Sequence, residues 1–207
     1  MKQVITKDNS ITFFNEKYDE HYHCLAGAKL EAIKKFIEPT NVKDGIVILD
    51  VCFGLGYNSA AALDTANNLT IFALENDPKI LEEIQTINAD FESYNMIKEV
   101  AKHKDYENTE KGIKIKLLLG DARETIHEIN EKIDAVFFDP FSPKKCPELW
   151  TLEFIKDVFK TMKPGGILAT YSCATHVRQK MKETGFIVKD GPIFGRKSPA
   201  TLGVKPL

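Results

Sequence analysis

Residues 136–150, VFFDPFSPKKCPELW, join the end of a predicted buried strand to an irregular loop. The aromatic and β-branched side chains of the strand are typical of strands that are buried on both faces. The apolar run stops at Asp139, and Pro140 and Pro143 prevent regular structure from continuing. Because ligands of open α/β sheets bind at the carboxyl ends of strands, the carboxylate of Asp139 beside Phe141 indicates an active site.

Strand-like and helix-like segments alternate around this stretch from about Gly45 onward. The expected strands cover residues 46–51, 70–75, 113–119, 133–138, 167–171, 186–188 and 202–204. The expected helices cover residues 57–67, 77–91, 123–130, 151–162 and 174–184. With right-handed crossovers, this alternation predicts an α/β, Rossmann-like, doubly wound and mostly parallel seven-stranded sheet with helices on both faces. We interpret the polar stretch 94–112 as a helix end and a surface loop.

The first 41 residues are predicted to form an N-terminal arm. One amphipathic helix is expected at about residues 24–37, and we expect the arm (1–41) to cover the ligand site of a domain that spans residues 42–207. His21 and His23 in the arm have no third potential ligand at close spacing, so we expect no metal.

The composition is that of a soluble globular protein. The 207 residues suit one domain, with 43% hydrophobic and 28% charged residues. No run of 18 apolar residues exists and the first residues lack the apolar core of a secretory signal, so we expect a cytoplasmic protein without a membrane span. The four cysteines form no CxxC pair, which argues against a zinc cluster. The net charge of −2 argues against nucleic-acid binding through overall charge. A local basic patch on one face could still contact nucleic acid.

A glycine loop follows the first strand of the predicted domain, with Gly54 and Gly56. Ser59 replaces the third glycine of a dinucleotide fingerprint, and the carboxylate of Asp50 is a poor neighbour for a pyrophosphate. A nicotinamide oxidoreductase is therefore disfavoured. S-adenosylmethionine fits better, because it carries an ammonium and a sulfonium and no phosphate.

Four successive predicted strands end in an acidic residue: Asp50, Glu75, Asp121 and Asp139. A carboxylate at the second position can accept both ribose hydroxyls, and one at the third can accept the adenine amine. The predicted cofactor-binding residues are Asp50, Phe53, Gly54, Gly56, Asn58, Glu75, Asn76, Gly120, Asp121, Ala122 and Asp139.

Three stretches carry a narrower resemblance. They are residues 135–151 (AVFFDPFSPKKCPELWT), 163–188 (KPGGILATYSCATHVRQKMKETGFIV) and 193–198 (IFGRKS). They resemble the methyltransferase domain of the bacterial tRNA 5-methylaminomethyl-2-thiouridine biosynthesis protein, MnmC, a class I methyltransferase. The likeness covers residues 13–198 and is most specific at 139–150 and 194–197, whereas the glycine loop is shared with most class I methyltransferases.

The resemblance implies methyl transfer from S-adenosylmethionine to the amine of 5-aminomethyl-2-thiouridine at the tRNA wobble position. Asp139, Pro140 and Phe141 would be catalytic, by likeness to the (D/N)PP(Y/F) loop of amino-methyltransferases. In that loop, the acidic oxygen and the proline carbonyl hold the amine. Whether Asp139 orients a neutral amine or accepts its proton is left open. The residues expected to contact substrate or RNA are Tyr22, Lys144, Lys145, Trp150, Arg178, Arg196 and Lys197, with packing in the core as the alternative for Trp150.

The sequence also departs from the family pattern. Cys146 stands where the family has asparagine, and the oxidase half of the fused bacterial proteins is missing. We therefore expect a stand-alone methyltransferase, with a separate upstream enzyme supplying the aminomethyl group. The alternatives are an aminopropyltransferase related to spermidine synthase and a methyltransferase that acts on another amine. A non-catalytic binding module is disfavoured because Asp139 and the glycines are retained.

Overall fold

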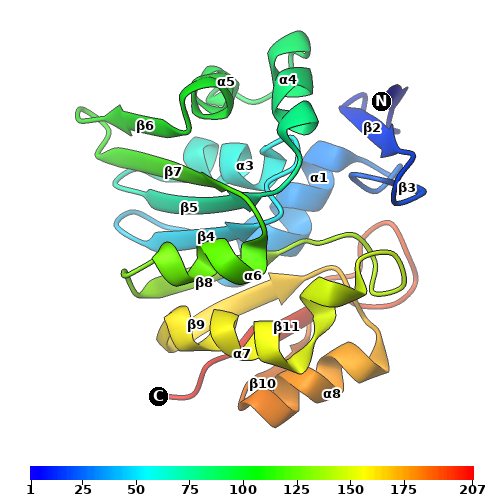
Figure 1. Ribbon diagram of the computed structural model, residues 1–207, viewed down its shortest axis with the longest axis vertical. Helices are drawn as coiled ribbons and strands as arrows, with labels where there is room; N and C mark the ends of the chain where they lie inside the picture. The colour runs from blue at the N-terminus through cyan, green and yellow to red at the C-terminus, as the bar shows by residue number, and fades with distance from the viewer.

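A computed structural model describes residues 1–207 and shows an eight-stranded sheet between two layers of helices (Figure 1). Its parallel centre consists of β4 (Val47–Val51), β5 (Thr70–Glu75), β7 (Ile113–Leu119), β8 (Ile133–Phe138) and β9 (Met162–Thr170). The antiparallel edges are β10 (Ile187–Asp190) and β11 (Thr201–Val204) on one side and β6 (Asp105–Asn108) on the other. The strand order is β10-β11-β9-β8-β4-β5-β7-β6, which confirms the predicted doubly wound, mostly parallel α/β fold.

The two faces of the sheet are covered by different helices. One layer contains α3 (Tyr57–Thr65), α4 (Pro78–Thr86), α5 (Tyr94–His103) and the helical segment of the arm. The other contains α6 (Ala122–Thr125), η2 (Ile126–Glu128), η3 (Pro147–Trp150), α7 (Leu152–Thr161) and α8 (Thr175–Thr184). Along β8, Phe137 packs in the first layer and Phe138 in the second, so this strand is buried on both faces as its sequence predicts.

The sheet has one strand more than predicted. The additional strand is β6, which lies in the polar stretch 94–112 that we interpreted as a helix end and a loop. Its sequence, DYEN, forms an edge strand of which Tyr106 packs against the core, and its other residues are charged or polar. Such a short polar edge lacks the apolar pattern that identifies a strand in sequence.

The N-terminal arm contains more structure than the one expected helix. Strands β1 (Lys2–Ile5), β2 (Ile11–Asn15) and β3 (Glu20–His21) form a small antiparallel sheet. A continuous helical segment follows, made of α1 (Ala28–Ala32), the π-helical turn η1 (Ile33–Ile37) and α2 (Glu38–Thr40). Phe36 of this segment contacts Phe137 of β8, with ring centroids 6.0 Å apart, which fixes the arm against the centre of the sheet. None of the helices has the length and apolar character needed to cross a membrane.

Candidate active site

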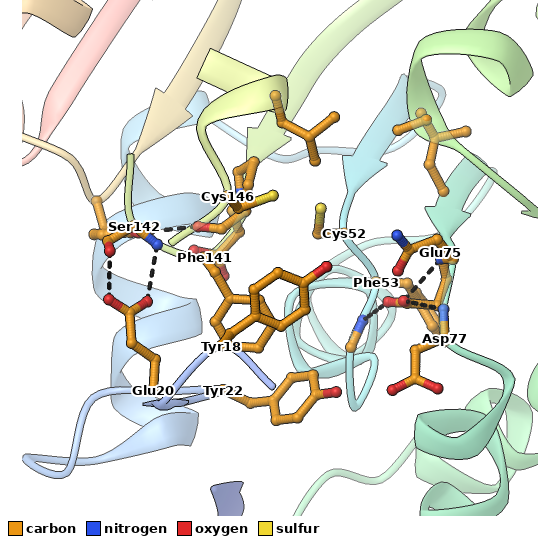
Figure 2. Close-up of a pocket in the computed structure, with 18 of the residues that line it drawn as sticks. Tyr18, Glu20, Tyr22, Cys52, Phe53, Glu75, Asp77, Phe141, Ser142 and Cys146 are labelled. Atoms are coloured by element: carbon orange, nitrogen blue, oxygen red, sulfur yellow. Dashed lines mark hydrogen bonds between the residues drawn. The ribbon is translucent and has the colours of Figure 1, made fainter. Parts of the chain in front are cut away.

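A cavity of about 510 Å³ lies at the carboxyl ends of the parallel strands. Glu75 at the end of β5, Gly120 after β7 and Asp139 after β8 line it, and the arm contributes Tyr18 and Tyr22 (Figure 2). β4 and β8 are neighbours in the sheet, so the strand order reverses beside the cavity. Open α/β sheets bind their ligands at such a point of reversal.

The glycine loop contributes Phe53 and Gly54 to the cavity, but not Gly56. Gly54 has φ +55°, and a Cβ atom there would lie 3.3 Å from the Tyr22 ring, at the cavity wall. Gly56 has φ +72°, and a Cβ atom there would lie 2.5 Å from Ile97. Packing against the helix layer therefore requires the second glycine, whereas a side chain on the first would press on the Tyr22 ring at the cavity wall.

Asp50 does not line the cavity either. Its side chain is fully buried, and its Oδ2 accepts a hydrogen bond of 2.6 Å from the Ser59 hydroxyl. Oδ1 has no hydrogen-bond partner. Burial raises the pKa of Asp50 to about 7. The structure thus places this predicted cofactor residue beneath the glycine loop, in contact with α3.

Glu75 and Asn76 line the cavity next to the glycine loop. The Glu75 carboxylate accepts three backbone N–H bonds of 2.8 Å, from Gly54, Asn76 and Asp77 (Figure 2). Burial raises the pKa of Glu75, and these bonds oppose that effect. The side chain therefore holds the glycine loop against the end of β5.

Asp121 lines the cavity together with Gly120 and Ala122. Its carboxylate caps α6 by accepting the Arg123 N–H at 2.9 Å, and it also pairs with the Arg123 guanidinium at 2.5 Å. The bonds from Arg123 hold the pKa of Asp121 below its ordinary value. Asp121 is thus a fixed, ionised carboxylate at the third strand end.

Asp139 lines the cavity after β8, which is separated by β4 from the strands that lead to Glu75 and Asp121, and the residue is partly accessible. Oδ2 accepts a hydrogen bond of 3.1 Å from Asn58 Nδ2, while Oδ1 has no hydrogen-bond partner in the protein. Burial raises the pKa of Asp139 well above its ordinary value, and the charge of Glu31 adds to this effect. One carboxylate oxygen therefore remains available to a ligand.

Three side chains fix the loop that follows Asp139, residues 139–142, which we call the DPFS loop. The Tyr171 hydroxyl donates to the Pro140 carbonyl at 2.9 Å, and Trp150 Nε1 donates to the Phe141 carbonyl at 2.8 Å. The third side chain, Glu20, belongs to the arm and accepts hydrogen bonds from the Ser142 N–H and hydroxyl (Figure 2). Trp150 is 1% exposed and does not line the cavity, which agrees with the core alternative for this residue.

Aromatic rings form the wall beside Asp139. Phe141 stacks on Tyr18 with ring centroids 4.5 Å apart, and Tyr22 meets Phe141 edge-on at 5.0 Å. Arg196, from the FGRK motif at residues 194–197, lies 5.1 Å above the Tyr171 ring and also lines the cavity. Pro140 and Phe141 themselves line it, so all three residues that we expected to be catalytic are brought together.

The other predicted substrate residues lie outside the cavity lining. Lys144 and Lys197 are exposed, Lys145 pairs with Asp19 at 2.9 Å, and Arg178 pairs with Asp190 at 2.6 Å.

Sequence reasoning missed several lining residues. Glu20 and Glu31 come from the arm, where no motif distinguishes them. Tyr171 is the last residue of a predicted strand and lines the cavity. The sequence interpretation selected only acidic residues at strand ends, so it did not include this tyrosine.

The cavity is acidic. Its lining contains the carboxylates of Glu20, Glu31, Glu75, Asp77, Asp121, Asp139 and Glu148, and the guanidinium groups of Arg123 and Arg196. Such a surplus of negative charge suits a cationic ligand. It fits S-adenosylmethionine, which carries positive charge on its ammonium and sulfonium groups.

A family model described as S-adenosyl-L-methionine-dependent methyltransferase matches residues 82–206. The chain belongs to this family of methyltransferases. The methyltransferase is 34% identical to MnmC2 from Aquifex aeolicus, and its structure matches the crystal structure of that protein with a TM-score of 0.81. The match covers 100% of this chain and 72% of the MnmC2 chain. These findings confirm the predicted fold, the cofactor and the likeness to MnmC.

Curated relatives extend the comparison. An uncharacterized protein of Methanocaldococcus jannaschii is 34% identical over 98% of this chain and 59% of its own length. The tRNA 5-methylaminomethyl-2-thiouridine biosynthesis bifunctional protein MnmC of Leptospira interrogans is 27% identical over 97% of this chain and 35% of its own length. The methyltransferase thus spans only part of these relatives. Spermidine synthase shares the fold alone, with a TM-score of 0.64 at 12% identity.

Proposed function

We propose that this methyltransferase transfers a methyl group from S-adenosylmethionine to the primary amine of 5-aminomethyluridine, or its 2-thio form, at the tRNA wobble position. The observation that carries the proposal is Asp139, which lines an acidic cavity beside the stacked rings of Phe141 and Tyr18 and whose Oδ1 has no hydrogen-bond partner in the protein. The relatives named for tRNA 5-methylaminomethyl-2-thiouridine biosynthesis support the same substrate.

The cofactor supplies an electrophilic methyl group on a sulfonium. Glu75 and Asp121 would bind its ribose and adenine, beside Phe53, Gly54 and Asn76, all of which line the cavity. Asp50 and Gly56 would act indirectly, by shaping the glycine loop from below.

The substrate amine must present a free lone pair, held in line with the methyl group. Asp139 Oδ1 would accept an N–H bond from the amine, while Asn58 keeps the carboxylate in place. The Tyr171 hydroxyl takes one lone pair of the Pro140 carbonyl, and the second is left for the amine. Tyr18, Tyr22 and Phe141 would stack against the uracil ring, as aromatic residues do with unpaired RNA bases.

The tRNA backbone would lie across the rim of the cavity. Arg196 lines the cavity. Lys144, just after the DPFS loop, and Lys197, in the FGRK motif, are both exposed. The arm, residues 1–41, would close the cavity over the domain that spans residues 42–207. A separate enzyme would supply the aminomethyl group.

Mass spectrometry of tRNA nucleosides tests the proposal. We expect tRNA that carries 5-aminomethyluridine to gain one methyl group on that nucleoside after incubation with the protein and S-adenosylmethionine. tRNA without the aminomethyl group is the control and should gain none. Aminopropyl transfer to a polyamine from decarboxylated S-adenosylmethionine, without methylation of this tRNA, would refute the proposal.

A further inference from the structure

A buried ion pair lies at the substrate end of the cavity. Lys35, which is 1% exposed, pairs with Glu31 at 2.6 Å, and the second Glu31 oxygen accepts the Cys24 N–H at 2.6 Å. Both residues belong to the helical segment of the arm, where Lys35 lies on the π-helical turn η1. Burying two charges is costly even when they are paired, and π-helical turns occur frequently at functional sites.

This pair lies beside Asp139. Glu31 lines the same cavity as Asp139, and the contact between Phe36 and Phe137 holds η1 against the strand that leads to Asp139. The two side chains act on Asp139 in opposite directions: the charge of Glu31 raises the pKa of its carboxyl group, and the charge of Lys35 lowers it.

Three further titratable groups interact electrostatically with Asp139: Asp50 on β4, Cys52 in the glycine loop and Tyr171 after β9. Burial raises the pKa of Cys52 and of Tyr171 well above their ordinary values, so both are neutral near pH 7. Asp50 has a pKa of about 7, and its charge also raises the pKa of Asp139. Because Asp50 stays the same in the variants below, differences among them report the ion pair.

We infer that Glu31 and Lys35 are positioning residues that set the proton affinity of Asp139, so that Asp139 can take a proton from the substrate ammonium. In this step one N–H bond of the ammonium breaks and an O–H bond forms on Asp139, while the electron pair stays on nitrogen. The proton later leaves Asp139 for water through the cavity. The inference rests on the proposed amine substrate, and it assigns to Asp139 the proton-accepting role that the sequence leaves open.

Charge removal on either side of the pair should shift the titration of Asp139 in opposite directions. Lys35→Met leaves two carboxylates uncompensated, so Asp139 keeps its proton to higher pH. Glu31→Gln leaves the Lys35 ammonium without its partner, so Asp139 loses its proton at lower pH. We expect the ascending limb of kcat/KM against pH to move by about one pH unit upward and downward, respectively.

The double variant Glu31→Gln/Lys35→Met should place this limb between those of the two single variants, because it removes both of the opposing charge effects on Asp139. Circular dichroism and binding of S-adenosylhomocysteine verify that each variant is folded. Limbs that stay in place, or that move in the same direction in both single variants, overturn the inference. If Lys35→Met does not fold, Glu31→Gln decides alone, since its limb must move to lower pH.

A second measurement is independent of methylation. ¹³C NMR titration of aspartate carboxyl groups, with Asp139→Asn used to assign the resonance, reads the pKa of Asp139 directly. Opposite displacements in the two single variants support the inference, and an unmoved resonance overturns it. If the wild-type protein does not methylate aminomethylated tRNA, the proposed function fails, while this titration still tests the effect of the ion pair on Asp139.

Discussion

At the scale of single residues, Asp139 combines a fixed oxygen with a free one. Asn58 holds Oδ2, whereas Oδ1 has no hydrogen-bond partner in the protein, and the residue lines the cavity. Asp139→Asn keeps the shape of the side chain and removes its charge and its ability to accept a proton. We expect methylation to fall at least tenfold, a typical effect of losing an acid–base group. Calorimetric titration with S-adenosylhomocysteine should give an affinity near that of the wild type, and unchanged turnover would contradict the assigned role.

Asp50 makes a different prediction, about stability. Its pKa is about 7 in the folded protein, against 3.8 for an unperturbed group, so between these values the folded state binds more protons than the unfolded state. Stability therefore falls as pH rises through this range. Asp50→Asn removes this dependence. The quantity to compare is the melting temperature of Asp50→Asn minus that of the wild type, measured by calorimetry. We expect this difference to be larger at pH 8 than at pH 4. An equal difference at both pH values would show that Asp50 does not titrate in this range.

At the scale of elements, Glu20 of β3 joins the arm to the DPFS loop, and the preceding residue, Asp19, contacts Lys145 beyond the loop. Glu20 accepts two hydrogen bonds from Ser142, whereas Asp19 makes an exposed ion pair with Lys145. Exposed pairs contribute at most about 1 kcal/mol, so Asp19 is a matched control for Glu20.

Glu20→Ala should free the arm from the loop and raise KM for tRNA severalfold, together with faster hydrogen exchange in residues 11–23. Asp19→Ala should change both quantities little. Steady-state kinetics and exchange mass spectrometry measure the two effects. Equal behaviour of the two variants would mean that the contact between Glu20 and Ser142 does not position the loop.

The same elements show what the sequence can predict. The apolar run that stops at Asp139 before a proline indicates both the strand β8 and the cavity residue at its end. An acidic residue at a strand end also predicts Asp50 as a cavity residue. The sequence does not show in which direction a side chain points, and the Asp50 side chain points toward Ser59. Glu20 and Glu31 reach the cavity through tertiary packing of the arm, which leaves no local pattern in the sequence.

At the scale of the whole molecule, both ends of the chain complete the site. The arm supplies Tyr18 and Glu31, and the FGRK motif near the C-terminus packs against it. A Cβ atom on Gly195 would lie 2.4 Å from the Cys24 sulfur, and Lys35 lies 5.9 Å from the Phe194 ring centroid. The sheet thus fixes the proposed cofactor side of the cavity, while contacts between distant segments of the chain form the proposed substrate side.

Because the overall charge is −2, the proposed tRNA substrate would be held by local positive charge at the rim of this acidic cavity. Lys144 and Lys197 are exposed, make none of the ion pairs found in the structure, and follow the lining residues Ser142 and Arg196 closely in the sequence. Each lysine that neutralises a phosphate contributes about one to the slope of log affinity against log salt. The double variant Lys144→Ala/Lys197→Ala should therefore weaken tRNA binding and reduce this slope by about two, as measured by fluorescence anisotropy over a series of salt concentrations.

Lys43 and Lys111 provide the matched control for this pair. They are exposed and precede β4 and β7, at the amino ends of the strands, opposite the cavity. Lys43→Ala/Lys111→Ala removes the same total charge, so an effect of net charge alone would appear equally in both double variants. We expect the slope of the control to match that of the wild type. A slope reduced equally in both variants would show an effect of net charge alone and would contradict the assignment of Lys144 and Lys197 to the tRNA contact.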